Sequence, residues 1–194
     1  MKKMNLLLLS FLIGFAVQAH ASNYKIDPQH STVSFKIRHL FSWVQGSFDK
    51  FEGDFTYDPQ DPESWMVTAS IDPASINTKV DQRDTHLRSK DFFDVEAYPS
   101  MSFESTQVMD ITPTSAKIYG NLKIHGVEKL VVLDLEIHGE GQDPWGNVLA
   151  GFTATTKLNR RDFGLIWNQV VETGQVLVGE EVLITIDIEG IKGA

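Results

Sequence analysis

The sequence predicts an all-β protein, an antiparallel sheet of roughly eight strands that closes into a barrel and carries one short helical insert. Three observations support this prediction. Apolar and polar residues alternate in segment after segment, which is the two-residue period of a strand. Each such segment is apolar on one face only, as in antiparallel sheets that have one face in water. A single stretch, residues 81–105, has helical character instead.

The inward face of each predicted strand is made of its apolar residues, which alternate with polar neighbours. In chain order these inward residues are Val33, Phe35 and Ile37; Phe51, Gly53, Phe55 and Tyr57; Trp65, Val67, Ala69 and Ile71; Met101, Phe103 and Ser105; Ala116, Ile118, Gly120, Leu122 and Ile124; Val131, Leu133, Leu135 and Ile137; Ala150, Phe152, Ala154, Thr156 and Leu158; and Val182, Ile184, Ile186 and Ile188. The segments follow one another at hairpin spacing, without a linker or a repeat, so they form a single domain.

A break in the alternation distinguishes a barrel from a β-sandwich. Phe48 is out of phase with Phe51 and the apolar residues that follow it. A bulge near Asp49 and Lys50 would restore the register and bend the strand, as closure of a barrel requires. The long bent strand and the single helical insert therefore favour a barrel, although a sandwich has the same alternation.

The helical insert lies within residues 81–105. Asp81 or Asp84 is the predicted N-cap, because each is a short acidic residue before a run of helix-compatible residues. Leu87 is expected on the face next to the turn before it, and Pro99 prevents the helix from continuing. A short helix with a charged start and an aromatic end is suited to be a lid over the mouth of the barrel.

The first 21 residues predict a secretory signal peptide. Lys2 and Lys3 precede an apolar run from Leu6 to Val17, and Ala19-His20-Ala21 resembles a cleavage site. The mature domain is therefore expected to span residues 22–194 and to be periplasmic. A lipoprotein anchor is excluded because the chain has no cysteine, so we expect no stable membrane anchor.

Charge and composition exclude several classes of function. Without Lys2 and Lys3 the chain has 15 basic and 26 acidic residues, a net charge of −11. Such an acidic protein is a poor ligand for nucleic acid or for an anionic membrane surface. Without cysteine it forms no disulfide and no zinc–thiolate site.

The inward face mixes large and small side chains. The large ones are Phe35, Phe55, Phe103 and Phe152, and the small ones are Gly53, Ala69, Ala116, Gly120 and Ala154. Small residues on an inner wall favour a cavity that holds one small ligand. A filled, tapering core also alternates large and small side chains, so both arrangements stay open.

Catalytic and metal-binding interpretations are weaker than structural ones. Asp27, His30 and Ser31 are the residue types of a hydrolase triad, but they are nearly adjacent, so bonds to the backbone are the better interpretation. The five histidines of residues 22–194 lack the spacing of a metal site. We therefore expect neither catalytic residues nor a metal.

A polar cluster on the insert is the best candidate for contact with a ligand head group. Arg83, Asp84, His86 and Arg88 could form a polar collar at the barrel mouth; the alternative is a solvated helix with an internal ion pair. Arg160 could join this collar, although a tight turn held by an internal Arg–Asp pair is the simpler interpretation.

Motifs along the whole mature chain resemble those of the YceI-like family of exported, lipocalin-like proteins. They are Ile26-Asp27-Pro28, His30-Ser31, Phe35, Ile76-Asn77-Thr78, Arg83-Asp84, His86-Leu87, Phe92-Phe93, Tyr98-Pro99, Phe103, Gly120, Leu122, His125-Gly126-Val127, Asn159-Arg160 and Asp162-Phe163-Gly164. The resemblance implies an eight-stranded antiparallel lipocalin-like β-barrel, lined by apolar side chains, that holds a long isoprenoid lipid such as a polyprenyl or quinone tail.

These observations predict a periplasmic binding or carrier protein for an apolar lipid: a polyisoprenoid, a quinone or a fatty acyl compound, with no other cofactor. A homodimer is one arrangement left open. The predicted ligand-binding residues are Phe35, Ile37, Phe41, Trp43, Phe55, Arg83, His86, Leu87, Phe92, Phe93, Phe103, Phe152 and Trp167. Two alternatives remain: a non-catalytic partner of a membrane redox complex, and an enzyme acting on isoprenoid lipid with His39, His86 or Asp84 as base.

Overall fold

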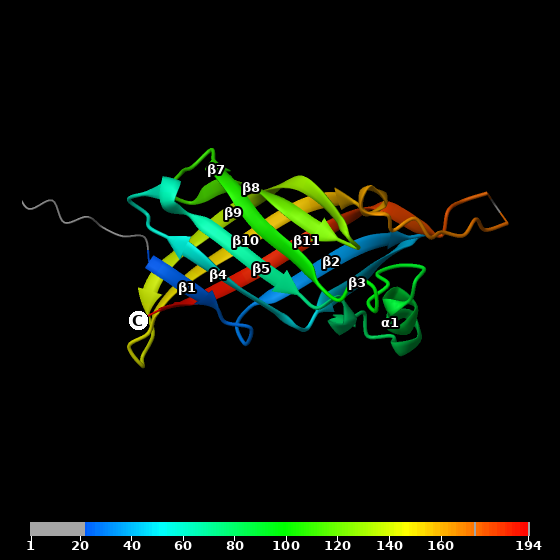
Figure 1. Ribbon diagram of the computed structural model, residues 1–194, viewed down its shortest axis with the longest axis horizontal. Helices are drawn as coiled ribbons and strands as arrows, with labels where there is room; N and C mark the ends of the chain where they lie inside the picture. Colours follow the sequence, from blue (N-terminus) through cyan, green and yellow to red (C-terminus); the bar gives the residue numbers. More distant parts are fainter. Residues whose placement is uncertain (1–21, 173, 194) are drawn as a thin grey trace, which may run out of the picture.

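The protein is a closed antiparallel β-barrel with one short α-helix at its end (Figure 1). Its structure, a computed structural model, describes residues 22–172 and 174–193. The predicted signal peptide, residues 1–21, lies outside the described residues. The elements are β1 (Ser22–Ile26), β2 (Thr32–His39), β3 (Ser42–Phe48), β4 (Phe51–Tyr57), η1 (Pro62–Ser64), β5 (Met66–Ile71), η2 (Pro73–Ser75), β6 (Ile76–Asn77), α1 (Asp81–Arg88), β7 (Met101–Met109), β8 (Ser115–Ile124), β9 (Val127–Gln142), β10 (Val148–Asn159), η3 (Arg160–Phe163) and β11 (Val178–Lys192).

The eleven strand segments form eight barrel strands, because three of the strands are broken in two. The long strand β11 pairs with β2 over residues 178–187 and with β1 over residues 190–192, so β1 and β2 lie end to end along it. Likewise β3 pairs with β2, and β4 with β1. The pieces β5 and β6 pair with β4 and β3 in turn. The remaining strands follow in hairpin order, and the β1–β11 pairing closes the ring. The predicted eight-stranded antiparallel barrel is confirmed.

The predicted irregularity at Asp49 and Lys50 lies at the break between β3 and β4. It is a break in the strand, with two residues outside the ladder, rather than a bulge within it. The Asp49 amide donates to the Ser75 carbonyl (3.2 Å), and the Asp72 amide donates to the Lys50 carbonyl (3.0 Å). Two neighbouring strands therefore bend at the same level, and the wall curves without leaving these backbone groups unpaired.

The predicted inward faces are correct. Val33, Phe55, Phe103 and Phe152 are buried, as alternation requires. The glycines of the wall have a different role from the one predicted. A Cβ on Gly120 would collide with the ring of Phe103, so this glycine seats an aromatic ring and does not itself leave free space. Gly46 and Gly190 lie against the rings of Phe35 and Phe55 in the same way.

Helix α1 is shorter than the insert that the sequence predicts. It ends at Arg88, well before Pro99, and the next residues form turns that lead into β7. The predicted aspartate N-cap is wrong: the N-cap is Val80, without a side-chain cap. Asp84 instead lies buried inside the helix and accepts from the amide (2.9 Å) and the hydroxyl of Thr78.

Arg88 attaches the helix to the barrel. Its Nε donates to the Ala74 carbonyl (2.7 Å) and its Nη2 to the Ile76 carbonyl (2.8 Å). These carbonyls belong to η2 and β6, the last pieces of the broken strand. Helix α1 is therefore held at one end of the barrel, opposite the end where β1 and the C-terminus lie (Figure 1).

Candidate functional site

A cavity of about 650 Å³ lies inside the barrel. This volume is within the range of roughly 300–1,000 Å³ that is typical of small-molecule sites. Most of the side chains that line the cavity are apolar and come from the barrel strands. They include Ile26, Val33, Val44, Val67, Ile71, Met101, Val108, Ile118, Leu122, Ile124, Leu133, Leu135, Leu158, Val182, Ile184, Ile186 and Ile188. The small-ligand cavity that the sequence favoured over a filled core is present.

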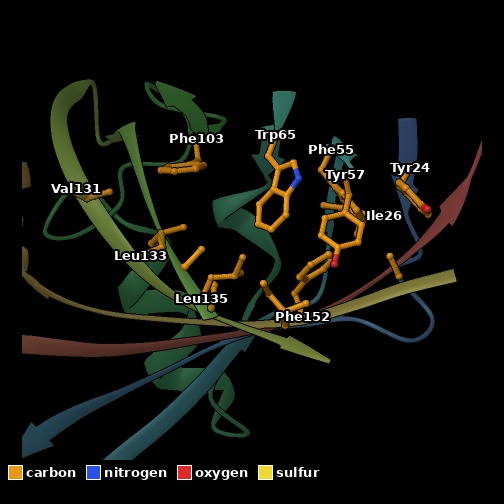
Figure 2. Close-up of a cluster of buried hydrophobic side chains, with 14 of the residues drawn as sticks. Tyr24, Ile26, Phe55, Tyr57, Trp65, Phe103, Val131, Leu133, Leu135 and Phe152 are labelled. Carbon is orange, nitrogen blue, oxygen red and sulfur yellow. The ribbon is translucent and has the colours of Figure 1, made fainter. Parts of the chain in front are cut away.

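One end of the barrel is closed by stacked aromatic rings (Figure 2). The rings of Tyr24 and Phe55 are stacked with centroids 5.0 Å apart, and Phe152 meets Phe55 edge-on at 5.3 Å. Tyr57 contacts both Phe152 (5.0 Å) and Trp65 (4.8 Å). Four of these rings, those of Phe55, Tyr57, Trp65 and Phe152, line the cavity and form its floor, and Tyr24 packs against them without lining it.

A buried phenol, Tyr24, supports the floor. The hydroxyl of Tyr24 donates to Glu140 Oε2 (2.8 Å), which satisfies the polar end of a ring that is otherwise fully buried. Burial, and then the hydrogen bond to the Glu140 carboxylate, raise the pKa of Tyr24 well above its ordinary value of 10.0. Tyr24 therefore stays neutral, and the floor carries no phenolate charge.

The other end is covered by a second aromatic group, which joins α1 and the turns after it to the segment that follows η3. His86 meets Trp167 edge-on, with ring centroids 4.8 Å apart, and meets Phe92 at 5.1 Å. Phe92 and Trp167 are themselves 5.1 Å apart. His86 Nε2 also lies 2.9 Å from Asp91 Oδ2. All three rings line the cavity, so this group, which we call the lid cluster (His86, Phe92 and Trp167), covers it at the α1 end.

Most of the predicted ligand-binding residues lie together. Those that line the cavity are Phe35, Ile37, Phe55, Arg83, His86, Leu87, Phe92, Phe93, Phe103, Phe152 and Trp167. Whether they contact a ligand stays a prediction.

Phe41 and Trp43 do not line the cavity, so the prediction that they bind a ligand inside the barrel is wrong. Phe41 is 79% exposed, in the turn between β2 and β3, and Trp43 is 48% exposed. Trp43 lies opposite Arg38 in the ladder, and the guanidinium carbon is 5.6 Å from the ring centroid. Alternation directs Ile37 and Val44 into the cavity, which leaves Trp43 on the outer face.

The collar residue Arg83 lines the cavity but is bound to the chain beside it. Its Nε donates to Thr78 Oγ1 (2.7 Å) and its Nη2 to the Thr78 carbonyl (2.8 Å). Thr78 thus links Arg83 to Asp84, and the ion pair that the alternative interpretation expected is replaced by this bridge. Arg83 holds the start of α1 whether or not it also contacts a ligand.

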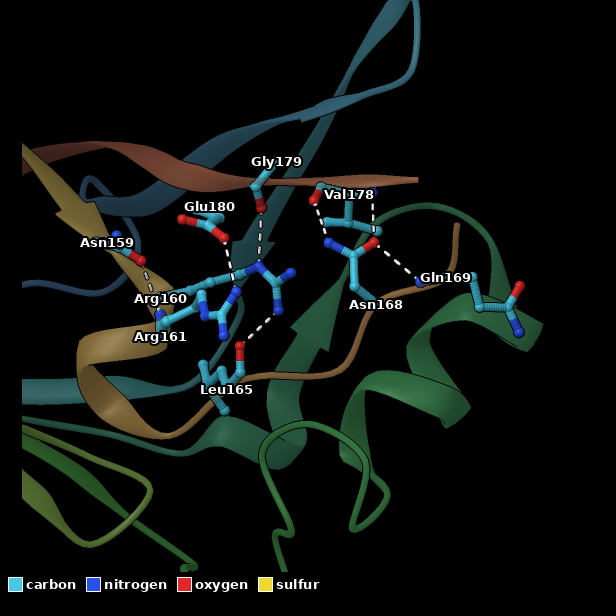
Figure 3. A network of polar contacts seen from close by, with 9 residues as sticks. All are labelled: Asn159, Arg160, Arg161, Leu165, Asn168, Gln169, Val178, Gly179 and Glu180. Carbon is cyan, nitrogen blue, oxygen red and sulfur yellow. Dashed lines mark hydrogen bonds and ion pairs between the residues drawn. The ribbon is translucent and has the colours of Figure 1, made fainter. Parts of the chain in front are cut away.

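Arg160 has a more prominent place than its sequence context indicated. Only 5% of it is exposed, and it lines the cavity. Its Nε donates to the Gly179 carbonyl (2.8 Å) and its Nη1 to the Leu165 carbonyl, as Figure 3 shows. The predicted internal Arg–Asp pair is wrong, because Arg161, the exposed neighbour, pairs with Glu180 (2.9 Å). The partner carbonyls of Arg160 are fixed by the tertiary fold, so the sequence around it gave no signal of its burial.

Asp27, His30 and Ser31, the residue types of a hydrolase triad, lie between β1 and β2 and do not line the cavity; Ser31 is buried. Ser31 Oγ accepts from the Glu189 amide (3.0 Å) and donates to the Glu189 carbonyl (3.3 Å), which agrees with the predicted backbone role. His30 Nδ1 instead bonds Asp27 Oδ2 (2.7 Å). This bond lowers the pKa of Asp27 and raises that of His30.

Within residues 22–172 and 174–193, Asp27, His30 and Glu189 are also the one group of potential metal ligands, with ligand atoms within 4.8 Å of one another. Such exposed acidic groups are common without a metal, and His30 Nδ1 is already bonded. The absence of a metal stays a prediction. In the same described part of the chain, no helix is long and apolar enough to span a membrane.

Relatives of this chain are numerous. A UPF0312 protein of Photorhabdus laumondii is 42% identical over 180 residues, which cover 91% of this chain and 90% of the relative. One of Azotobacter vinelandii is 40% identical over 186 residues, 94% of this chain and 93% of the relative.

Solved structures share the fold. The Campylobacter jejuni YceI protein has a TM-score of 0.71 at 26% identity, with 98% of this chain and 100% of that chain covered. Burkholderia cenocepacia BcnA has a TM-score of 0.75 at 22% identity, covering 84% and 98%. A polyisoprenoid binding domain from Saccharophagus degradans has a TM-score of 0.63 at 14% identity, covering 90% and 100%.

The family model described as the YceI-like domain matches residues 24–190, which is nearly all of the described barrel. Together with relatives at 40% identity or more over most of both chains, this match identifies the family. The chain belongs to the family of proteins with a YceI-like domain.

Proposed function

We propose that this protein binds an apolar lipid inside its barrel and carries or sequesters it in the periplasm. The observation that carries the proposal is the cavity itself: about 650 Å³, lined almost entirely by apolar side chains, with an aromatic floor at one end and the lid cluster at the other. The structural relative from Saccharophagus degradans, described as a polyisoprenoid binding domain, supports an isoprenoid or similar chain as ligand.

Hydrocarbon transfer supplies enough free energy for such binding. Burial of each methylene is worth about 0.8 kcal/mol, so ten methylenes contribute about 8 kcal/mol. Association and ordering offset about 4–15 kcal/mol of the total. Ten methylenes fall within the range of this cost, so a clear surplus of binding free energy needs a longer chain, one that extends from the lid cluster toward the floor.

Binding without catalysis is the function that the titratable residues support. Of the three candidate bases, Asp84 is bonded to Thr78, and His86 packs against Phe92 and Trp167 and is bonded to Asp91. Each of these two has a structural partner that accounts for its position. His39 lines the cavity at the end of β2 but has no carboxylate ion-pair partner in the described residues to orient it as a general base.

The four tryptophans provide the experiment. Trp65 and Trp167 line the cavity, whereas Trp43 and Trp145 are exposed, at 48% and 84%. Two variants that each keep one pair, with phenylalanine at the other two positions, should respond differently to a quenching lipid such as a quinone with an isoprenoid tail. We expect strong, saturable quenching for the Trp65/Trp167 variant and weak quenching for the Trp43/Trp145 variant.

Native mass spectrometry of the mature protein, purified gently from the periplasm, complements the quenching test. A retained hydrophobic mass that organic extraction removes is the expected result. Equal quenching of both tryptophan pairs, together with a clean unliganded mass and no uptake of prenyl or fatty acyl lipid, contradicts the proposal.

A further inference from the structure

Four large apolar side chains lie exposed in two segments at the α1 end of the barrel. Phe41 and Trp43 belong to the β2–β3 hairpin, and Val170 and Val176, which are 69% and 53% exposed, belong to the segment between η3 and β11. This second segment projects beyond the barrel at the end that carries α1 (Figure 1). We call the four residues the apolar rim (Phe41, Trp43, Val170 and Val176).

The projecting segment is held in place by hydrogen bonds. Val170 and Val176 pair across an antiparallel bridge. Closer to the barrel, the Asn168 side chain accepts from the Val178 amide (3.0 Å) and donates to the Val178 carbonyl (2.7 Å), as Figure 3 shows. The exposed valines are therefore presented by paired backbone, which is a defined surface.

The two segments are joined to each other and to the cavity. The amide of Leu40, next to Phe41, donates to the Leu177 carbonyl (3.1 Å), and His39 pairs with Val178 in the ladder. His39, Leu177 and Val178 all line the cavity. The apolar rim therefore lies one or two residues along the chain from the cavity wall.

The cavity reaches the protein surface at this same end. Val80 and Gln82, at the start of α1, line the cavity and are exposed. Trp167 of the lid cluster is half-buried, whereas Trp65 and Phe152 of the floor are buried. A ligand that enters beside α1 therefore passes close to the apolar rim.

The rim segments carry little of the negative charge of the chain. The sequence has 26 acidic residues, but residues 38–48, 164–171 and 174–179 contain none, and Glu172 is the one acidic residue between 164 and 179. The Arg38 guanidinium lies over the Trp43 ring at 5.6 Å. A tryptophan beside an arginine, next to phenylalanine and valine, is the composition of a surface that lies at the level of lipid head groups.

We propose that the apolar rim docks reversibly on a lipid bilayer and that the cavity exchanges its lipid with that bilayer at the α1 end. The ligand decides the partner, because each methylene that leaves a membrane for water costs about 0.8 kcal/mol. A rim with one guanidinium and one carboxylate matches zwitterionic head groups, and the acidic remainder of the chain disfavours anionic ones. This inference rests on the lipid-binding function proposed above and adds the surface through which the lipid enters.

Flotation of the mature protein with phosphatidylcholine vesicles tests the docking. We expect the wild type to bind, and Phe41→Ser/Trp43→Ser to bind at least about 10-fold more weakly, since two apolar side chains no longer enter the bilayer. Ile111→Ser/Trp145→Ser is the matched control, because it also removes two exposed apolar side chains, from the β7–β8 and β9–β10 turns. This control should bind like the wild type, and melting curves verify that both variants fold.

Two measurements on the wild type need no variant. Hydrogen exchange of the segments around Phe41 and Val170 should slow when vesicles are added, while exchange in the β9–β10 turn stays the same. Vesicle binding should persist at high salt and weaken as phosphatidylglycerol replaces phosphatidylcholine, because the contact is apolar and the chain is acidic. Binding that strengthens with phosphatidylglycerol and is lost in salt would overturn the proposal.

Lipid uptake from two sources separates this inference from the function on which it rests. Phe41→Ser/Trp43→Ser should take up a quinone with an isoprenoid tail more slowly than the wild type from vesicles, but equally fast from a detergent dispersion. If the wild type takes up lipid from detergent and does not bind vesicles, docking is wrong and lipid binding stands. If vesicles bind through the rim and no lipid enters from either source, the docking surface stands and the lipid-binding function is wrong.

The remaining outcomes concern the partner. Equal vesicle binding by the wild type and Phe41→Ser/Trp43→Ser would show that another surface meets the bilayer. A wild type that does not bind vesicles but is dimeric by light scattering, and becomes monomeric in Phe41→Ser/Trp43→Ser, would make the apolar rim an interface between two copies of the chain. Either result overturns the proposal.

Discussion

The Asp84 carboxylate accepts both the backbone amide and the hydroxyl of Thr78, so a buried acidic side chain inside α1 holds the loop that connects β6 to the helix. Arg83 binds the same threonine from the other side, through its hydroxyl (2.7 Å) and carbonyl (2.8 Å). The start of α1 is thus fixed by one threonine and two charged residues, rather than by a side-chain cap at Val80.

Asp84→Asn should lower the free energy of unfolding by about 1–3 kcal/mol, because both bonds from Thr78 go to one carboxylate oxygen, Oδ1, and a neutral amide oxygen accepts them more weakly than a charged one. Asp81→Asn is the matched control, since Asp81 is an exposed aspartate at the start of the same helix. Urea denaturation measures both. A loss of stability in Asp81→Asn as large as that in Asp84→Asn would show that helix charge, and not the bond to Thr78, is responsible.

Gly120→Ala should destabilise the barrel by about 1–3 kcal/mol, since the added Cβ would overlap the Phe103 ring and the Glu104 carbonyl oxygen (2.6 Å). Gly141→Ala in β9 is the control, because nothing lies within 4 Å of its added Cβ. Thermal denaturation of the two variants tests this. Equal melting temperatures would mean that the ring of Phe103 moves aside without cost.

The strand faces were predictable from sequence because the side-chain period of a strand is fixed by geometry. Phe35, Phe103 and Phe152 needed nothing beyond the alternation around them. The broken strands were partly predictable, since the phase change after Phe48 marks the break at Asp49 and Lys50. Local sequence patterns are therefore sufficient to predict which side chains face the inside of the barrel.

The ends of the barrel were not predictable in the same way. Phe41 and Trp43 are aromatic residues in an alternating segment, yet the β2–β3 hairpin leaves them outside the cavity. One of the two carbonyls that hold the buried Arg160 is that of Gly179, which β11 brings to it from 19 positions away in the sequence. Contacts of this kind depend on how elements that are distant in the chain pack together. A local sequence pattern carries no information about that packing.

Phe35→Asp should prevent stable folding or empty the cavity. Phe35 lines the cavity and contacts Phe48, with ring centroids 5.7 Å apart, so the variant would bury an unpaired carboxylate at a cost of several kcal/mol. Lys36→Asp, at the exposed neighbouring position, should leave the fold and lipid uptake intact. An unchanged melting curve and unchanged lipid uptake in Phe35→Asp would contradict the assignment of this face.

The pair of Asp27 and His30 should make stability depend on pH. The bond to His30 lowers the pKa of Asp27 below its ordinary value of 3.8, so its contribution is present above 3.8 and is lost as the pH falls through the lowered value. The bond to Asp27 raises the pKa of His30 above 6.5, so that contribution is complete below 6.5 and is lost as the pH rises through the raised value. The window of greatest stabilisation lies between 3.8 and 6.5.

His30→Gln should therefore lower the melting temperature inside this window and change it little at alkaline pH. The carboxylate of Glu189, 3.6 Å from His30 Nδ1, acts in the same direction. Melting temperatures of wild type, His30→Gln and Asp27→Asn across the pH range test the prediction. A constant difference between wild type and His30→Gln at every pH would show that the pair contributes no proton-linked stability.

The lid cluster should control the rate of ligand exchange. Trp167 contacts His86 and Phe92 across the junction between α1 and the segment after η3, and each aromatic contact is worth about 0.5–1.5 kcal/mol. Loss of both contacts in Trp167→Ala should therefore speed lipid release by roughly 5- to 150-fold. Trp145→Ala, which removes an exposed tryptophan in the β9–β10 turn, should not change release.

Association rates decide whether the cluster is a gate or only part of the wall. If it is a gate, Trp167→Ala raises the association and dissociation rate constants together, and the affinity changes less than either, because opening limits both directions. If Trp167 only contributes a contact with the lipid, dissociation becomes faster while association stays the same. Stopped-flow mixing with a quenching lipid gives both rates, and an unchanged association rate would reject gating.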